Sequence, residues 1–279
     1  MASFLNFQDS NSAIMNFAFI IMIIIVFFVV LQFSISFISY FMNSENGSPY
    51  LINGMVEGKT MIEIEQDPNK SDSITLLRSS NERDGVEFTY STWLYIDDLE
   101  YNKGQFRHIF HKGDDKLNYD DDSIGAGLSY PNNAPGLYLA PYRNDIVVVV
   151  NTFQNVIEKI VIENITLNKW INVIIRCENK TIDVYVNGSI ARRHILSGLP
   201  RQNYGNVFCC MNGGFSGNIS NLRYFNYAIG TRQIESILFW GPNTKLATGS
   251  NINMDNYGYL SFKWYTSGQV NNSKNTVVV

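Results

Sequence analysis

The first side chains whose spacing suggests chemistry are the carboxylates of Glu63 and Glu65. Two residues apart on a β-strand, they would lie on one face, near the separation of about 5.5 Å that a retaining glycosidase needs. The chain continues with Gln66, Asp67 and Pro68, and the pair lies at the entry of the predicted domain rather than in the middle of a sheet. We therefore interpret both carboxylates as solvated charges at a sheet edge, and we predict that the protein is not an enzyme.

A run of acids farther along the chain raises the question of a calcium site. It comprises Asp114, Asp115, Asp120, Asp121 and Asp122. Calcium needs several oxygen ligands around one point, and the run lacks the glycine that an EF-hand loop places at its sharp turn. We favour a solvated loop. If the loop does hold calcium, Asp120 or Asp122 and a loop carbonyl or amide are the expected ligands, and no other cofactor is predicted.

The three histidines indicate metal binding only weakly. His108 and His111 form an H-x-x-H pattern, and His194 stands alone. Such a pair can chelate on a helix, but residues three apart on a strand point to opposite faces. Because no third ligand is evident, we predict structural or surface roles for these histidines.

The cysteines, Cys177, Cys209 and Cys210, form no disulfide framework. Neighbours on a strand point in opposite directions, so Cys209 and Cys210 are poor partners for each other. A bridge from Cys177 to one of them is geometrically open. We favour buried free thiols, which are typical of a reducing compartment.

Glycan binding would need an exposed aromatic platform with amides and carboxylates beside it. Tyr138, Tyr142, Tyr204 and Trp240 are the candidates, although packing or rim positions are the favoured interpretation of each. Asn-x-Ser/Thr sequons occur at Asn46, Asn69, Asn164, Asn179, Asn187, Asn218 and Asn271. They accept glycans only if the domain is lumenal or extracellular, and chance matches are expected among 33 asparagines.

The elements that must position these side chains divide the chain of 279 residues in two. Asp9 is the sole charged residue before Glu45, whereas residues 45–279 carry 21 basic and 24 acidic side chains. This split predicts a membrane segment joined to a polar globular part. The mild net charge of −4 argues against a nucleic-acid partner, which would require a basic face.

An unbroken apolar run within the uncharged stretch predicts a single-pass transmembrane helix. The run includes Phe17, Ile21, Ile24, Phe28 and Leu31 and extends to about 25 residues, where about 20 suffice to cross a bilayer. A cleaved signal peptide is the alternative, disfavoured because the segment lacks a basic start and a clean small-residue cleavage site. No Lys or Arg precedes the span, so its orientation stays undetermined.

The remaining chain predicts an all-β sandwich, because short runs of β-branched and aromatic residues alternate with turn residues. Asn187-Gly188 indicates a tight hairpin turn, and Thr231–Phe239 is the one helix-like segment, with Thr231 as its cap. The predicted strands are Met61–Gln66, Ile74–Leu77, Val86–Ile96, Arg107–Lys112, Ala126–Tyr130, Leu137–Ala140, Asp145–Asn151, Ile157–Val161, Trp170–Cys177, Ile182–Val186, Asn206–Met211, Asn218–Phe225 and a last one, Tyr257–Tyr265.

Six segments, taken in order, resemble the laminin-G-like (LamG-like) branch of the concanavalin-A-like jelly-roll domains. They are EFTYSTWLYI (Glu87–Ile96), HIFHKG (His108–Gly113), PGLYLAP (Pro135–Pro141), DIVVVVNTF (Asp145–Phe153), the Trp-led hairpin Leu167–Gly188 and the closing strand and helix Gly213–Ile234. The resemblance covers roughly Met61 to Trp240. It implies an antiparallel jelly-roll sandwich whose fold-defining core residues are Trp93, Trp170, Tyr185, Gly188 and Gly217.

A narrower resemblance is to LamG-like proteins of large nucleocytoplasmic DNA viruses. It lies in the transmembrane N-terminus, in the QDPN and LLRS segments that begin at Gln66 and Leu76, and in the closing LRYFNYAI and GPN segments that begin at Leu222 and Gly241. It implies a minor capsid or virion membrane protein that tethers an internal membrane to the capsid, with the bilayer and capsid proteins as partners. A membrane-displayed lectin or adhesin for host glycans, calcium-dependent or not, is the alternative.

The predicted layout follows from these elements. It has a polar N-terminus (1–12), the transmembrane helix (13–42), a linker rich in Gly (43–60), the sandwich (61–265) and a polar tail (266–279).

Overall fold

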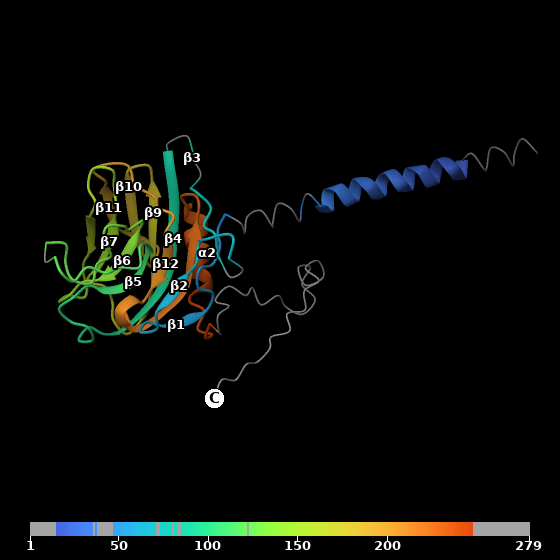
Figure 1. Ribbon diagram of the computed structural model, residues 1–279. Helices are drawn as coiled ribbons and strands as arrows, with labels where there is room; N and C mark the ends of the chain where they lie inside the picture. Colours follow the sequence, from blue (N-terminus) through green and yellow to red (C-terminus); the bar gives the residue numbers. More distant parts are fainter. Residues whose placement is uncertain are drawn as a thin grey trace, which may run out of the picture. The chain divides into compact units, whose positions relative to one another are not determined.

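The computed structural model describes residues 15–35, 37, 47–70, 73–79, 81, 82, 85–121 and 123–247. It contains two compact units, divided between Ser48 and Pro49. The first holds the helix Met15–Ile35, and the second is a sandwich of two antiparallel sheets (Figure 1). The predicted all-β sandwich, preceded by one apolar helix, is therefore confirmed.

Each sheet is built from segments that lie far apart in the sequence. The seven-stranded sheet comprises, in spatial order, β1 (Met55–Glu57), β13 (Ser216–Phe225), β4 (Gly85–Asp98), β9 (Trp170–Glu178), β10 (Thr181–Val186) and β11 (Ser189–Ile195), with β3 (Asn81–Glu82) beside β4. The six-stranded sheet comprises β2 (Ile62–Ile64), β12 (Asn206–Cys209), β5 (Arg107–Gly113), β6 (Gly136–Leu139), β7 (Ile146–Val150) and β8 (Glu158–Ile162).

The N-terminal helix has 21 residues, and the side chains described on it are exposed. Its length and composition are sufficient for it to cross a membrane. The parts of the predicted span outside Met15–Ile35, apart from Phe37, lie beyond the described residues.

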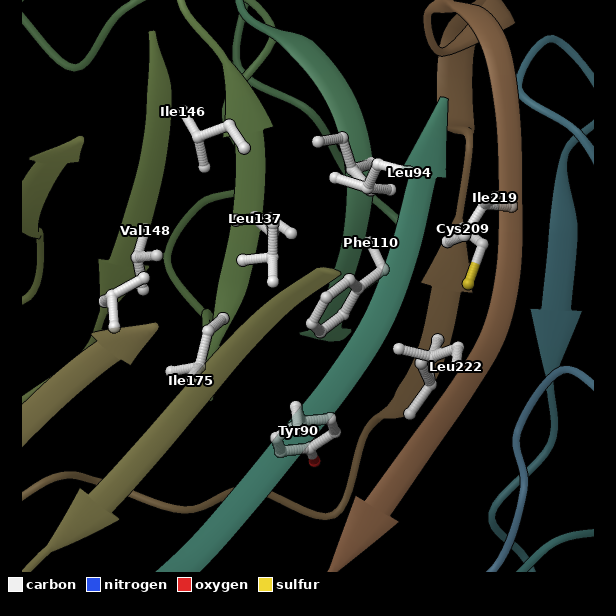
Figure 2. Packing of buried hydrophobic residues seen from close by; sticks show 14 of the residues in the cluster. Tyr90, Leu94, Phe110, Leu137, Ile146, Val148, Ile175, Cys209, Ile219 and Leu222 are labelled. Atoms are coloured by element: carbon white, nitrogen blue, oxygen red, sulfur yellow. The ribbon is translucent and has the colours of Figure 1, made fainter. Parts of the chain in front are cut away.

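The main hydrophobic core lies between the two sheets. On β4, residues Phe88, Tyr90 and Leu94 point inward at the two-residue spacing of a strand. Figure 2 shows how residues from both sheets, such as Phe110 and Ile175, meet in this layer. Burying each such side chain contributes about 1.5–3 kcal/mol.

A second hydrophobic cluster covers part of the outer face of the seven-stranded sheet. There Ile174 and Phe225 pack against Ile229 and against Ile234 of α2 (Thr231–Trp240). The predicted helix is confirmed, but its N-cap is Gly230, and Thr231 is the first helical residue.

The three aromatic residues predicted for the core lie outside the layer between the two sheets. Trp93 is buried as predicted, but it alternates with the inward residues of β4 and so faces outward. Trp170 also faces outward, half-buried against Tyr95, with ring centroids 5.6 Å apart. Tyr185 is half-buried beside the α2 cluster. The pattern could not distinguish the two faces because both are covered.

Two glycines fulfil their predicted role through backbone geometry. Gly188 follows Asn187 in the β10–β11 hairpin, and both have positive φ, as the predicted tight turn requires. Gly217 has a φ of 139°, and a Cβ there would lie 1.9 Å from the carbonyl oxygen of Tyr95. No other residue fits this approach between β13 and β4.

The remaining differences between prediction and structure concern short or exposed segments. Ile74–Leu77 and Ala126–Tyr130 are not strands, while β1 and β11 were not predicted. The predicted linker contains β1 and the fully buried Leu51 and Ile52. The predicted strand Tyr257–Tyr265 and the tail lie outside the described residues.

Candidate functional site

A cavity of about 800 Å³ opens at one end of the sandwich, and we call it the end cavity. Residues near the first half of β4 and the end of β13 line it from one sheet, and residues near the ends of β5 and β7 line it from the other. Three irregular stretches, 65–68, 75–78 and 200–204, complete its wall together with Asn206 at the start of β12. This volume lies in the range of sites for small organic ligands.

The floor of the end cavity is formed by core residues. Phe88, Tyr90, Val150 and Tyr224 line it, and each of them is at least 96% buried. The Tyr224 hydroxyl donates to the Leu77 carbonyl at 2.9 Å. The Tyr90 hydroxyl has no hydrogen-bond partner among the described residues. Burial raises its pKa well above the usual value, so the hydroxyl stays protonated. It is therefore available to a water molecule or a ligand.

One buried amide joins the stretches 65–68 and 75–78 of this wall. Gln66 accepts from the Leu76 N–H at 3.0 Å and donates to the Ile64 carbonyl at 3.3 Å. Its own N–H donates to the side chain of Asn206 on β12. These bonds explain how a segment without regular structure forms a defined wall.

The mouth carries three basic side chains, Arg78, Lys112 and Arg201. None of them forms an ion pair with a described residue. Lys112 Nζ donates to the Gly205 carbonyl at 2.6 Å, and burial lowers its pKa to about 8. An ammonium group has three donors, so Lys112 retains hydrogen-bonding capacity toward the cavity.

Two acids also line the mouth, and both have partners close by. Glu65 pairs with Lys70 at 2.6 Å, and Asp67 accepts from Asn69 at 2.8 Å. The hydrogen bond from Lys70 lowers the pKa of Glu65. Glu63, the second acid of the predicted pair, is exposed and accepts from Asn206 at 2.7 Å. Each carboxylate thus has its own surface partner, as expected for solvated edge charges.

One of the four candidate platform aromatics lies at this mouth. Tyr204 is fully exposed there, and the exposed Phe153 also lines the mouth. Tyr142 and Trp240 are exposed elsewhere, whereas Tyr138 is fully buried, in agreement with the favoured packing role. Its hydroxyl lies in a polar network with Asn133 and the Ser129 backbone.

The two histidines on β5 correct a second expectation. His108 and His111 lie on the same face, with His108 Nε2 and His111 Nδ1 2.6 Å apart. The pairing of β5 with β6 slips by one residue between His108 and Phe110, and this irregularity reverses the alternation. Both rings are buried, as a structural role requires.

The tautomer of each ring follows from its neighbours. The backbone N–H of Met211 in η1 (Met211–Gly213) donates to His108 Nδ1, so the His108 proton resides on Nε2. That proton is donated to His111 Nδ1, and His111 Nε2–H donates to the Asp114 carbonyl at 2.8 Å. Burial lowers the pKa of His111 to about 4 and lowers that of His108 well below its usual value, so both rings are neutral near pH 7.

The acidic run does not come together around one point. Asp114 accepts from Asn132, and Asp121 accepts from Ser123, while Asp120 is exposed. Among the described residues, no three His, Cys, Asp or Glu side chains gather as a metal site would require. Asp122 lies outside the described residues, so the calcium expectation remains a prediction.

The cysteines are buried and unpaired. Cys177 lies on β9 and Cys209 on β12, with Cys210 following it. Burial raises the pKa of the Cys177 and Cys210 thiols to about 12, so these thiols are neutral and unreactive.

The sequence signalled this site only in part. Tyr204 and the acids near Glu65 were singled out, but Lys112, Phe153 and Arg201 were not. Phe153 and Arg201 lie in connecting segments, and Lys112 is the one half-buried residue of an otherwise buried strand, so no periodic pattern marks them.

Comparison with solved structures shows a likeness of fold alone. The botulinum neurotoxin serotype G binding domain is 14% identical, with a TM-score of 0.46 and coverage of 70% of this chain and 50% of its own. The receptor-binding domain of a botulinum neurotoxin C/D mosaic is 12% identical, with a TM-score of 0.41 and coverage of 56% and 36%. This chain thus spans half or less of the length of these proteins.

Sequence comparison is more specific. No curated protein matches the chain. The family model described as the concanavalin A-like lectin/glucanases superfamily, Laminin_G_3, matches residues 68–235. Because this match covers more than half of the chain and agrees with the observed double sheet, the chain belongs to the concanavalin A-like lectin/glucanases superfamily.

Proposed function

We propose that this protein is a single-pass membrane-anchored, non-enzymatic interaction module. The observation that carries the proposal is the uncharged helix Met15–Ile35, exposed along its length, in a chain whose other unit is a lectin-type sandwich. The helix holds the protein in a bilayer, and the sandwich presents its loops and edges to a partner. The acids Glu63 and Glu65 support a non-enzymatic role, because each is held by its own surface partner.

The proposed partner is a protein layer next to the membrane, namely the capsid of a large DNA virus with an internal membrane. This role requires a stable anchor and a sandwich that withstands its surroundings, rather than a catalytic centre. The closed hydrophobic core and the cross-sheet contacts of the edge strands support it.

Location and crosslinking test this proposal together. The full chain is followed through purified virions, where intact mass should show that residues 15–35 are retained, and crosslinking mass spectrometry should join sandwich lysines to capsid protein. A mature protein that begins after the helix contradicts the anchor. Recovery only from host-cell surfaces or secreted fractions contradicts the capsid role.

A second candidate function is glycan recognition, which the composition of the end-cavity mouth favours. The fully exposed ring of Tyr204 lies there with the amides of Gln202 and Asn203, the groups that stack on and hydrogen-bond to sugars. A glycan array probed with the full chain in nanodiscs, with and without calcium, distinguishes this function from the first. Binding lost in Tyr204→Ala supports it, whereas a blank array counts against it.

A further inference from the structure

We infer that the end cavity binds an amphipathic anion, an acyl chain that ends in a carboxylate. This inference rests on the lining of the cavity and does not depend on the membrane anchor or on a capsid partner.

The apolar part of the ligand is indicated by the depth of the cavity. It reaches between the two sheets to Phe88 and Val150, and Leu76 and Val86 continue the apolar wall. Phe88 and Val150 belong to the main hydrophobic core. A chain of methylene groups would remove this apolar surface from water, and each methylene that is buried adds to the affinity. A sugar, with a hydroxyl on nearly every carbon, would leave those hydroxyls unpaired against this floor.

The charge of the ligand is indicated by the mouth. The lining there contains three basic and two acidic side chains, and Lys70, which lies outside the lining, already neutralises Glu65. Lys112 is the deepest of the three basic groups, and the Gly205 carbonyl takes one of its donors. A ligand carboxylate at this position would supply the counter-charge that the partly buried ammonium of Lys112 lacks among the described residues.

The size of the site agrees with this ligand. About 800 Å³ is ample for a chain of medium length.

Decanoate and its analogues provide the binding test, with the full chain held in nanodiscs of zwitterionic phospholipid. Calorimetric titration should show saturable binding of decanoate above the background of empty nanodiscs. Decanol lacks the anion and decyltrimethylammonium reverses the charge, so both should bind at least about tenfold more weakly. Equal binding of the three probes would overturn the proposal.

Two lysine variants provide a matched control. Lys112→Met keeps the length of the side chain but removes its charge, and decanoate affinity should fall about tenfold. Lys159 on β8 is also partly buried and also donates to a carbonyl, that of Ile124, but it lies outside the cavity. Lys159→Met should bind decanoate like the unchanged protein. Equal affinity of the Lys112→Met variant and the unchanged protein contradicts the proposal.

Photolabelling keeps the proposal testable even if Lys112→Met does not fold. A diazirine-bearing fatty acid should label peptides that contain Phe88 or Val150, and excess decanoate should suppress this label. Label confined to the helix Met15–Ile35 would mean partition into the bilayer alone and would overturn the proposal.

Discussion

At the scale of single residues, the sandwich depends on positions where one atom decides whether two strands can approach. Gly217 is such a position, because β13 passes the Tyr95 carbonyl of β4 too closely for any side chain. Arg107 stabilises the sandwich in a different way. It is 1% exposed, and its guanidinium donates to the Leu99 carbonyl at 2.6 Å and to the Ala140 carbonyl. Arg107 thereby joins the loop that follows β4 to the loop that follows β6.

The first prediction concerns the close approach at Gly217. Gly217→Ala combines an unfavourable positive φ with a Cβ 1.9 Å from a carbonyl oxygen, so it should destabilise the protein by more than about 3 kcal/mol. Gly104→Ala is the matched control, because Gly104 also has a positive φ, but its nearest neighbour is the Tyr142 hydroxyl at 3.7 Å. It should lose only about 1 kcal/mol. Denaturant unfolding measures both, and equal losses would refute the steric argument.

The second prediction concerns the buried pair on β5. A histidine whose folded-state pKa is lowered keeps its stabilising effect above the unfolded value of about 6.5 and loses it as the pH falls toward the folded value. For His111, with a folded pKa of about 4, this loss amounts to about 3 kcal/mol between pH 7 and pH 4.

His111→Gln tests this prediction, because an amide can accept from His108 and donate to the Asp114 carbonyl without titrating. Unfolding free energies measured from pH 7 to pH 4 should fall less steeply in the variant. Parallel curves for the variant and the unchanged protein would show that His111 does not titrate in this range on unfolding.

At the scale of elements, the two sheets are joined at one edge by a single carboxylate. Glu158 on β8 accepts from His194 of β11 at 2.8 Å and from the backbone and hydroxyl of Ser197. Burial alone would raise its pKa, but the hydrogen bonds from His194 and Ser197 outweigh burial and lower it. β8 and β11 are the edge strands of the two sheets, so Glu158 closes the sandwich on this side.

The third prediction concerns this edge. Glu158→Gln keeps the shape but removes the charge that strengthens these bonds, and it should destabilise the protein by about 1–2 kcal/mol near pH 7. The difference should shrink as the pH falls through the lowered pKa of Glu158, because the unchanged side chain is then itself protonated. Glu163→Gln, at an exposed position that follows β8, should change stability by less than about 0.5 kcal/mol. Thermal unfolding of the two variants compares them, and equal shifts would contradict the closing role of Glu158.

The elements also show where sequence reasoning succeeds and where it fails. β4 and β9 were predicted because their apolar runs are long, and the Asn187-Gly188 turn because its residues tolerate positive φ. β11 was missed because it is exposed on both faces, so SIARRHI has no apolar alternation. The His108–His111 contact was missed because one slipped residue in the pairing with β6 reverses the face of every residue that follows.

At the scale of the whole molecule, the two units differ sharply in their charge. Residues 15–35 carry no charge, whereas the charged side chains of the sandwich lie mostly at its surface, with Arg107, Asp145, Glu158 and Asp183 as buried exceptions. Asp183 is stabilised by Arg193 at 2.6 Å and by Arg176 at 3.5 Å. The end cavity was not predictable at this scale, because its lining comes from segments that only the closed sandwich brings together.

The last prediction concerns the proposed anchor. The free energy of inserting the helix into a bilayer decides how many charges are needed to release it. The helix contains 15 Phe, Ile, Leu or Val residues, each of which favours insertion by about 0.3–0.6 kcal/mol, whereas an Arg near the centre costs about 3 kcal/mol. A single Arg should therefore leave the helix in the bilayer. The pair Ile21→Arg and Phe28→Arg should bring the balance close to zero and release the protein from membranes washed at alkaline pH.

The control also replaces two apolar residues by Arg, but on an exposed strand of the sandwich. Ile190 and Ile195 of β11 are 51% and 73% exposed, so Ile190→Arg with Ile195→Arg should leave the protein in the membrane fraction. If both double variants stay in that fraction, the helix is not what holds the protein there. If the unchanged protein is itself released, it has no membrane anchor, and the end cavity would then have to obtain its ligand from solution.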